Sequence, residues 1–125
     1  MKPGVAPMRT MVCVTAQRQC ERLIRAGSHI AMSAPLSVVH VAPMDQPFLY
    51  GKDDAQPLDF LYKIAKSFNA DMIVEHNDHP LDAIVDLAAR LRIECVVIGV
   101  SAPGIQNPFG EALAAQLPHI QIYTE

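Results

Sequence analysis

Apolar residues along this chain follow two alternating patterns. Short, nearly continuous apolar runs are typical of strands buried on both faces of a sheet. Between these runs, apolar residues recur every three or four positions, which is the spacing of an amphipathic helix. The runs predict five strands, at residues 10–15, 36–42, 70–76, 94–99 and 119–124.

Four helices are predicted in the segments between these strands, at residues 20–31, 58–68, 80–91 and 107–117. Pro80 supports the start of the third helix, because proline is favoured in a first helical turn. Strict alternation of strand and helix favours parallel strands whose connecting helices cover both faces of the sheet. The predicted fold is therefore a three-layer α/β sandwich with a five-stranded parallel sheet, of the flavodoxin-like or Rossmann-like kind.

Chain length bounds the number of domains. A chain of 125 residues, half of them apolar, can bury one substantial core and is short for two. Residues 1–8 show neither a strand nor a helix period and include Pro3, Gly4 and Pro7, so a disordered lead-in is expected there. We expect a single domain over residues 9–125.

Composition argues against nucleic acid and membranes as partners. The formal net charge is −3 and only 18% of residues are charged, so no strong field would attract a polyanion or an anionic membrane. No apolar run approaches the roughly 18 residues that span a bilayer, and the first residues lack a secretory pattern. A cytoplasmic protein is expected.

Its cysteines, Cys13, Cys20 and Cys95, lie in apolar patterns typical of reduced core thiols.

In an open parallel sheet, ligands bind beyond the carboxyl ends of the strands, where the strand order reverses. The segments that follow the strands are residues 15–19, 41–54, 75–80 and 99–111. The residues of these segments exclude two common classes of protein with this fold. A receiver domain needs acidic residues after the first strand and a late lysine, whereas Thr15 stands at the first position and no lysine follows Lys66. Phosphate loops that place glycines directly after the first strand are also absent.

A metal site is a weaker candidate. His76, Asp78 and His79 follow the third strand, and imidazole with carboxylate suits zinc or similar ions. The alternative is structural: Asp78 or His79 caps the helix that begins at Pro80, and His76 is a polar loop residue. No spacing places a nucleophile beside a base, so we assign no catalytic residue and do not expect an enzyme.

The first helix carries a basic stripe. Arg18, Arg22, Arg25 and His29 follow one another at steps of four, three and four residues, which places them on one side of a helix. Such a stripe is usually the solvated face of an amphipathic helix. Arg18 differs from the others because it lies at the helix start, where it could contact a phosphate.

Four segments carry a family resemblance: VCVTAQRQCERLIRAG (12–27), LSVVHV (36–41), ADMIVEHNDHPLDAIVDLAARLRIECVVIGVS (70–101) and IQIYT (120–124). Together they resemble the universal stress protein family, and the first looks most like the universal-stress-like module of the sensor kinase KdpD and its free-standing relatives. The resemblance spans roughly residues 9–124. It implies a five-stranded parallel sheet, commonly a dimer, and in one branch an adenine nucleotide bound beyond the first and fourth strands.

That nucleotide-binding branch has an acidic residue after the first strand and a glycine loop after the fourth. The loop has two glycines separated by two residues, then nine residues, then a glycine followed by serine or threonine. This chain has Thr15 near the acidic position, four residues between Gly99 and Gly104, and five between Gly104 and Gly110. Glu111 stands where the hydroxyl belongs, and its carboxylate would repel a triphosphate. The ATP-binding form of the loop is therefore not expected.

Other nucleotide-like ligands remain open, since the resemblance implies that some KdpD modules bind a cyclic dinucleotide at the same end of the sheet. The candidate ligands are an adenine nucleotide and a cyclic dinucleotide. The candidate ligand-binding residues all follow a strand or lie in the glycine loop: Thr15, Gln17, Arg18, Val41, Gly99, Ser101, Gly104, Asn107 and Gly110. The alternative is that Gly104 and Gly110 only shape turns around Pro103 and Pro108.

Two functions follow from these observations. The first is a small stress-response or regulatory sensor that binds a nucleotide-like ligand and changes its contacts with a regulatory protein partner. The second is a ligand-free interaction module that acts through its dimer surface. Residues 119–124 alternate, carry no lysine or proline, and are expected at an exposed sheet edge, which invites pairing with another chain. We expect a homodimer through this strand.

Overall fold

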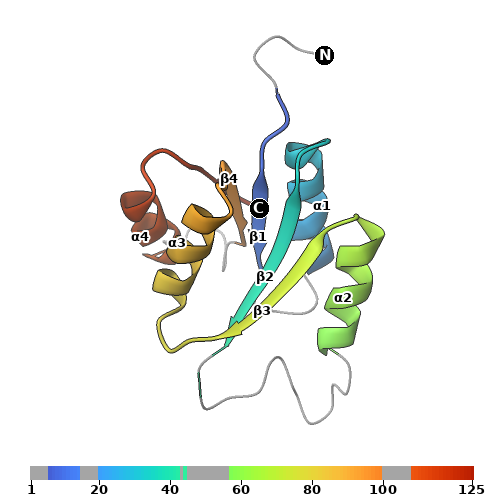
Figure 1. The fold of residues 1–125 in the computed structure, drawn as a ribbon, viewed down its shortest axis with the longest axis horizontal. Helices are drawn as coiled ribbons and strands as arrows, with labels where there is room; N and C mark the ends of the chain where they lie inside the picture. The colour runs from blue at the N-terminus through green and yellow to red at the C-terminus, as the bar shows by residue number, and fades with distance from the viewer. Residues whose placement is uncertain (1–5, 15–19, 43, 45–56, 100–107) are drawn as a thin grey trace.

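A computed structural model of the chain describes residues 6–14, 20–42, 44, 57–99 and 108–125. Strands and helices alternate along it from one end to the other (Figure 1). In chain order they are β1 (Thr10–Cys13), α1 (Cys20–Ala31), β2 (Leu36–Ala42), α2 (Pro57–Ser67), β3 (Asp71–His76), α3 (Pro80–Arg90), β4 (Cys95–Ile98), α4 (Pro108–Gln116) and β5 (Gln121–Thr124).

The strands form one parallel sheet in the order β3-β2-β1-β4-β5. This confirms the predicted five-stranded parallel α/β fold. The chain builds the sheet outward from β1 to β3, then returns to the other side of β1 for β4 and β5. The strand order therefore reverses between β1 and β4.

Four of the strands are shorter than the sequence predicts. β3 begins at Asp71 instead of residue 70, and β4 spans Cys95–Ile98 instead of residues 94–99. β1 ends at Cys13 instead of residue 15, although the Val14 N–H still donates to the Val39 carbonyl oxygen at 2.9 Å. β5 begins at Gln121 instead of residue 119. Its start is delayed because the Ile120 N–H donates to the Leu117 carbonyl oxygen, which makes residue 120 part of the turn after α4.

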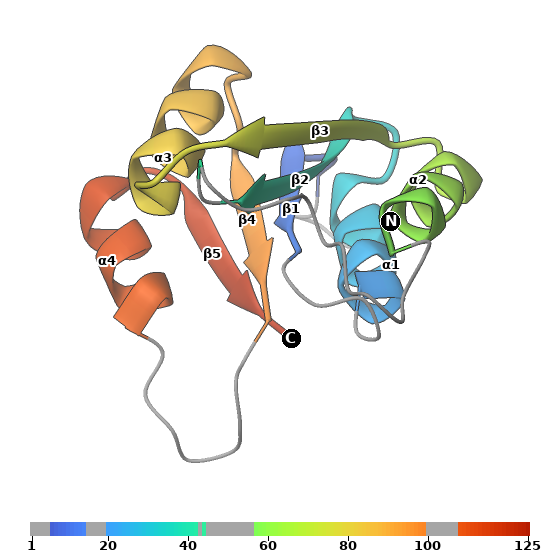
Figure 2. The same cartoon turned by 90° about the horizontal axis from the view of Figure 1, so that it is seen from below.

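Helices cover both faces of the sheet, with α1 and α2 on one side and α3 and α4 on the other (Figure 2). Alternate residues of the central strands supply the two cores, because successive side chains of a strand point to opposite faces. Toward α1 and α2 the strands present Val12, Val38 and Val97. Toward α3 and α4 they present Met11, Val39 and Val96. These six side chains are almost completely buried.

The edge strands differ from the central ones. β3 is half-buried along most of its length, and three of the four residues of β5 are exposed. Strands buried on both faces are therefore found only in the middle of the sheet, and the expectation of full burial is wrong for β3. The position of β5 at an edge confirms the expectation for the last strand.

The three cysteines are free thiols. Cys20 and Cys95 are buried and Cys13 is partly buried, as expected of core cysteines, and their reduced state stays a prediction. Burial raises the pKa of the Cys13 thiol to about 12 and also raises the pKa values of Cys20 and Cys95. Thiols of this kind are poor nucleophiles at neutral pH, because the thiolate is the reactive form.

Among the helices that the structure describes, none is long and apolar enough to cross a membrane. The first strand begins at Thr10, and the bounds of a single domain over residues 9–125 stay a prediction. The proposed disorder of residues 1–8 stays a prediction, since residues 1–5 lie outside the described part of the chain.

Candidate functional site

The candidate site lies at the carboxyl ends of β1 and β4, where the strand order reverses. The end of β1 is held by its neighbour β2 through two hydrogen bonds at Val14. Its N–H donates to the Val39 carbonyl oxygen, and its carbonyl oxygen accepts a hydrogen bond from His40 Nδ1 at 3.0 Å. His40 is 5% exposed, so a buried ring makes this hydrogen bond to Val14, the residue that precedes the segment 15–19. Because a carbonyl can only accept, Nδ1 carries the proton.

The end of β4 lies against the first turns of α1. Gly99 is half-buried, and a Cβ built on it would stand 3.4 Å from Leu23 Cδ1, which is an ordinary van der Waals distance. Its backbone is not in the left-handed region. Neither the backbone nor these neighbours therefore require glycine at position 99. Because glycine has no side chain, none covers the main chain at this position.

The end of β5 is linked to both β4 and α1. The Glu125 N–H donates to the Ile98 carbonyl oxygen at 3.0 Å. The Glu125 carboxylate accepts a hydrogen bond from the Tyr123 hydroxyl at 3.0 Å, and its other oxygen lies 4.0 Å from Arg22 Nε. The hydrogen bond and the charge of Glu125 raise the pKa of Tyr123.

Of the predicted ligand-binding residues, Val41, Gly99 and Gly110 lie in the described part of the chain. Val41 is half-buried near the end of β2 and packs toward α3, and it is separated from Gly99 by β1 in the sheet. Gly110 is buried in the first turn of α4. The remaining residues lie outside the described residues: Thr15, Gln17, Arg18, Ser101, Gly104 and Asn107. Their roles stay predictions.

The interpretation of Gly110 as a turn residue is wrong. α4 begins at Pro108, which suits a first turn because proline has no N–H that needs a partner within the helix. Gly110 lies within this helix and not in a turn before it. Glu111 lies in the same first turn and is exposed, where its negative charge is favourable at the positive end of the helix dipole.

The segment after β3 does not contain the side-chain cap that the sequence analysis expected from Asp78 or His79. His79 occupies the N-cap position of α3 but makes no side-chain cap hydrogen bond. The Asp78 carboxylate instead accepts a hydrogen bond from the Met44 N–H at 2.9 Å. It is Asn77 whose side-chain oxygen accepts from the His79 N–H, at 2.8 Å. A side-chain oxygen that accepts the backbone N–H two residues on forms an Asx turn, which here leads into the helix.

Within the described residues, no group of three or more His, Cys, Asp or Glu side chains is placed to hold a metal ion. Absence of a metal from the whole chain stays a prediction.

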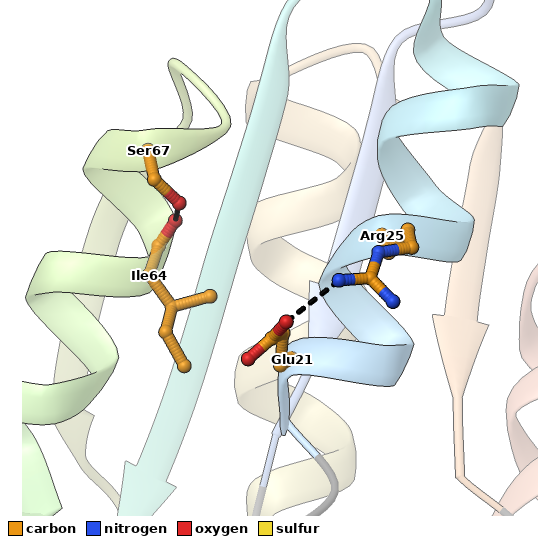
Figure 3. Close-up of polar contacts among 4 residues, drawn as sticks. All are labelled: Glu21, Arg25, Ile64 and Ser67. Atoms are coloured by element: carbon orange, nitrogen blue, oxygen red, sulfur yellow. Dashed lines mark hydrogen bonds and ion pairs between the residues drawn. The ribbon is translucent and has the colours of Figure 1, made fainter.

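The described part of the basic stripe is exposed, and the Arg25 guanidinium reaches the carboxylate of Glu21 one turn earlier on α1, at 2.6 Å (Figure 3). Figure 3 also shows the end of α2, where Ser67 Oγ donates to the Ile64 carbonyl oxygen.

Two contacts at this site were missed by the sequence analysis. His40 belongs to a segment that carries the family resemblance, but its hydrogen bond to Val14 depends on the pairing of β1 with β2. Glu125 and Arg22 come together only because β5 ends beside the start of α1. No local sequence signal predicts that contact.

Comparison with known proteins gives one curated relative and several solved structures. A putative sensor protein KdpD from Synechocystis is 32% identical over 95 residues, which cover 74% of this chain and 25% of that protein. The chain therefore spans about a quarter of the length of this relative. No protein family profile matches the chain.

The solved structures with similar folds are universal stress proteins. One from Archaeoglobus fulgidus has a TM-score of 0.68 at 21% identity, covering 94% of this chain and 92% of that one. A structure of the Archaeoglobus fulgidus protein in complex with dAMP has a TM-score of 0.61 at 22% identity, covering 94% and 96%. A universal stress protein in complex with cAMP has a TM-score of 0.60 at 19% identity, covering 96% and 98%. The resemblance to universal stress proteins and to KdpD is thereby confirmed, and at these identities the structures establish the fold.

Proposed function

Since this chain has the universal stress protein fold and is similar in sequence to part of a KdpD sensor protein, we propose that it is a small cytoplasmic regulatory protein that binds a nucleotide-like ligand beyond β1 and β4. The observation that carries the proposal is the reversal of strand order between these two strands. Gly99 lies at that position, at the end of β4, with no packing or backbone reason for a glycine in its described surroundings. The proposed role is binding and not catalysis.

The proposed ligand is an adenine nucleotide or a cyclic dinucleotide. Support comes from the solved relatives in complex with dAMP and cAMP, each of which has a single phosphate. A ligand with few charges also suits this chain better than ATP. Glu111 places a carboxylate in the first turn of α4, after the glycine loop, and a triphosphate there would be repelled.

A thermal-shift screen tests this proposal. The melting temperature is measured with AMP, cAMP, a cyclic dinucleotide or ATP for the wild-type protein. The same ligands are then tested on the variants Arg18→Ala and Gly104→Val. A ligand at one hundred times its dissociation constant should add about 2.7 kcal/mol, an upward shift of a few degrees for a domain of this size. Lys63→Ala, on the exposed side of α2, is the matched control and should keep the shift. A screen in which no nucleotide raises the melting temperature would contradict the proposal.

The second candidate function is an interaction module that acts as a homodimer through residues 119–124. It is favoured by β5, which lies at a sheet edge, has no charged residue, and exposes Tyr123 at 44%. An edge of this kind offers unpaired backbone groups to another chain. A regulatory protein partner would then bind the dimer surface.

Sedimentation tests the dimer. The wild-type chain should sediment as a dimer at micromolar concentration, and Tyr123→Lys should shift it toward monomer, because lysine on an edge strand opposes pairing. Tyr62→Lys on α2 is the matched control, since Tyr62 is 46% exposed and lies away from β5. A wild-type monomer, or equal effects of the two variants, would overturn the homodimer.

A further inference from the structure

The flank of α1 and the end of β5 form an open hollow, and its described lining includes none of the described nucleotide-binding candidates Val41, Gly99 and Gly110. Tyr123 lies in register with Val97, whose side chain packs toward α1, so the tyrosine ring lies on the same face of the sheet. The hollow between the ring and α1 has a volume of about 300 Å³. Its lining includes Arg22, Arg25, His29, Ile30, Tyr123 and Glu125.

One carboxylate already lies among the lining residues of this hollow. Glu125 accepts the Tyr123 hydroxyl at 3.0 Å through one oxygen, and its other oxygen lies 4.0 Å from Arg22 Nε. A guanidinium and a phenol hydroxyl therefore converge on a single oxyanion. The Arg22 side chain is 53% exposed and Tyr123 is 44% exposed, so an anion from solution can reach both donors.

The rest of the lining combines positive charge with apolar surface. Arg25 and His29 continue the basic stripe along α1, and Arg25 is partly neutralised by Glu21. Ile30 and the face of the Tyr123 ring supply apolar walls. A volume of this size lies at the lower end of the range for small-molecule sites. The chemistry therefore matches a small oxyanion that carries an apolar or aromatic body.

We propose that this hollow binds a small organic oxyanion, a carboxylate or a phosphate monoester, which displaces the Glu125 carboxylate from Arg22 and Tyr123. Glu125 is then an internal competitor that sets the affinity of the site. The proposal goes beyond the nucleotide site, because it uses the side of α1 and the end of β5 and none of the residues predicted for the glycine loop.

Titration with phenyl phosphate, followed by ¹H–¹⁵N NMR, tests the proposal. The amide signals of residues 22–30 and 121–125 should move together. Removal of the competitor in Glu125→Gln should tighten binding by roughly threefold, whereas Arg22→Gln should weaken it by roughly threefold, in line with the strength of exposed ion pairs. The spectra themselves show whether each variant is folded. Lys63→Gln on α2 should leave the affinity unchanged, and phenol should bind less tightly than phenyl phosphate.

The opposite signs of the two variants separate a binding site from a structural ion pair. If Arg22 and Glu125 only held β5 against α1, both substitutions would change the spectrum in the same region without opposite effects on affinity, and the proposal would be wrong. It would also be overturned if phenyl phosphate moved no signals, or moved those of Val14 and Gly99 instead, since the ligand would then bind at the ends of β1 and β4. A nucleotide that fails to bind leaves this result unaffected.

Discussion

Gly27 of α1 lies so close to Val12 of β1 that a Cβ at position 27 would stand 2.4 Å from Val12 Cγ2. The same Cβ would stand 3.2 Å from Leu36 Cδ1. Val12 is completely buried, and its branched side chain has little freedom to rotate away. Glycine at this position therefore sets how closely α1 packs on the middle of the sheet.

Gly27→Ala should destabilise the fold. Overpacking of a core costs about 1–3 kcal/mol, and the better helix propensity of alanine offsets at most about 1 kcal/mol of this. Urea denaturation should show a lower midpoint with an unchanged slope. Gly99→Ala is the control, because its Cβ would make only ordinary contacts with Leu23. Equal midpoints for the two variants would show that α1 can move away from β1 at little cost.

His40→Phe should also lower stability, for a different reason. The substitution keeps a ring in the buried site but removes the donor to the Val14 carbonyl oxygen. A buried acceptor that loses its donor costs about 1–3 kcal/mol. His29→Phe on the exposed side of α1 is the comparison and should change the urea midpoint little. A His40→Phe midpoint equal to that of the wild type would mean that the hydrogen bond contributes nothing measurable.

Asn77→Ala should weaken the start of α3, whereas His79→Ala should not. The Asn77 side chain accepts the His79 N–H, whereas the His79 side chain makes no cap hydrogen bond, and the net contribution of such a hydrogen bond is about 0.5–1.5 kcal/mol. The free energy of unfolding of the two variants measures the difference. A larger loss for His79→Ala would restore the interpretation of His79 as the capping side chain.

The stability of the fold should decrease at high pH because of the Cys13 thiol, which is partly buried against the core. Burial raises its pKa from 9.0 to about 12, so the unfolded chain loses the thiol proton before the folded chain does. This contribution to stability is complete below pH 9 and is lost as the pH rises from 9 toward 12. Cys20 and Cys95 act in the same direction.

Urea unfolding of the wild type and of Cys13→Ala at a series of pH values checks this prediction. The variant should be less stable at pH 7, because it leaves space in the core, but its stability should decrease less steeply above pH 9. Parallel decreases for the two proteins would show that other groups, such as Tyr123, control the response to alkali.

The strands and helices were predictable from local pattern, and their ends were less so. The apolar residues of α1 and β2 recur at a regular period, and both elements have the predicted bounds. β5 starts later than predicted because a backbone hydrogen bond in the preceding turn competes with the sheet. The Asx turn at Asn77 was missed because several side chains near a helix start can accept the same N–H, and the backbone path selects among them.

The sequence by itself determined the alternating order of elements and therefore the parallel α/β sheet, since burial of periodic apolar faces leaves few other arrangements. The tertiary structure decided which strands lie side by side. β1 pairs with β2 and β4, and this places His40 on the Val14 carbonyl oxygen and brings Glu125 to Arg22. Such contacts join residues from distant parts of the chain. They depend on strand order, which the pairing of whole elements sets and no local period encodes.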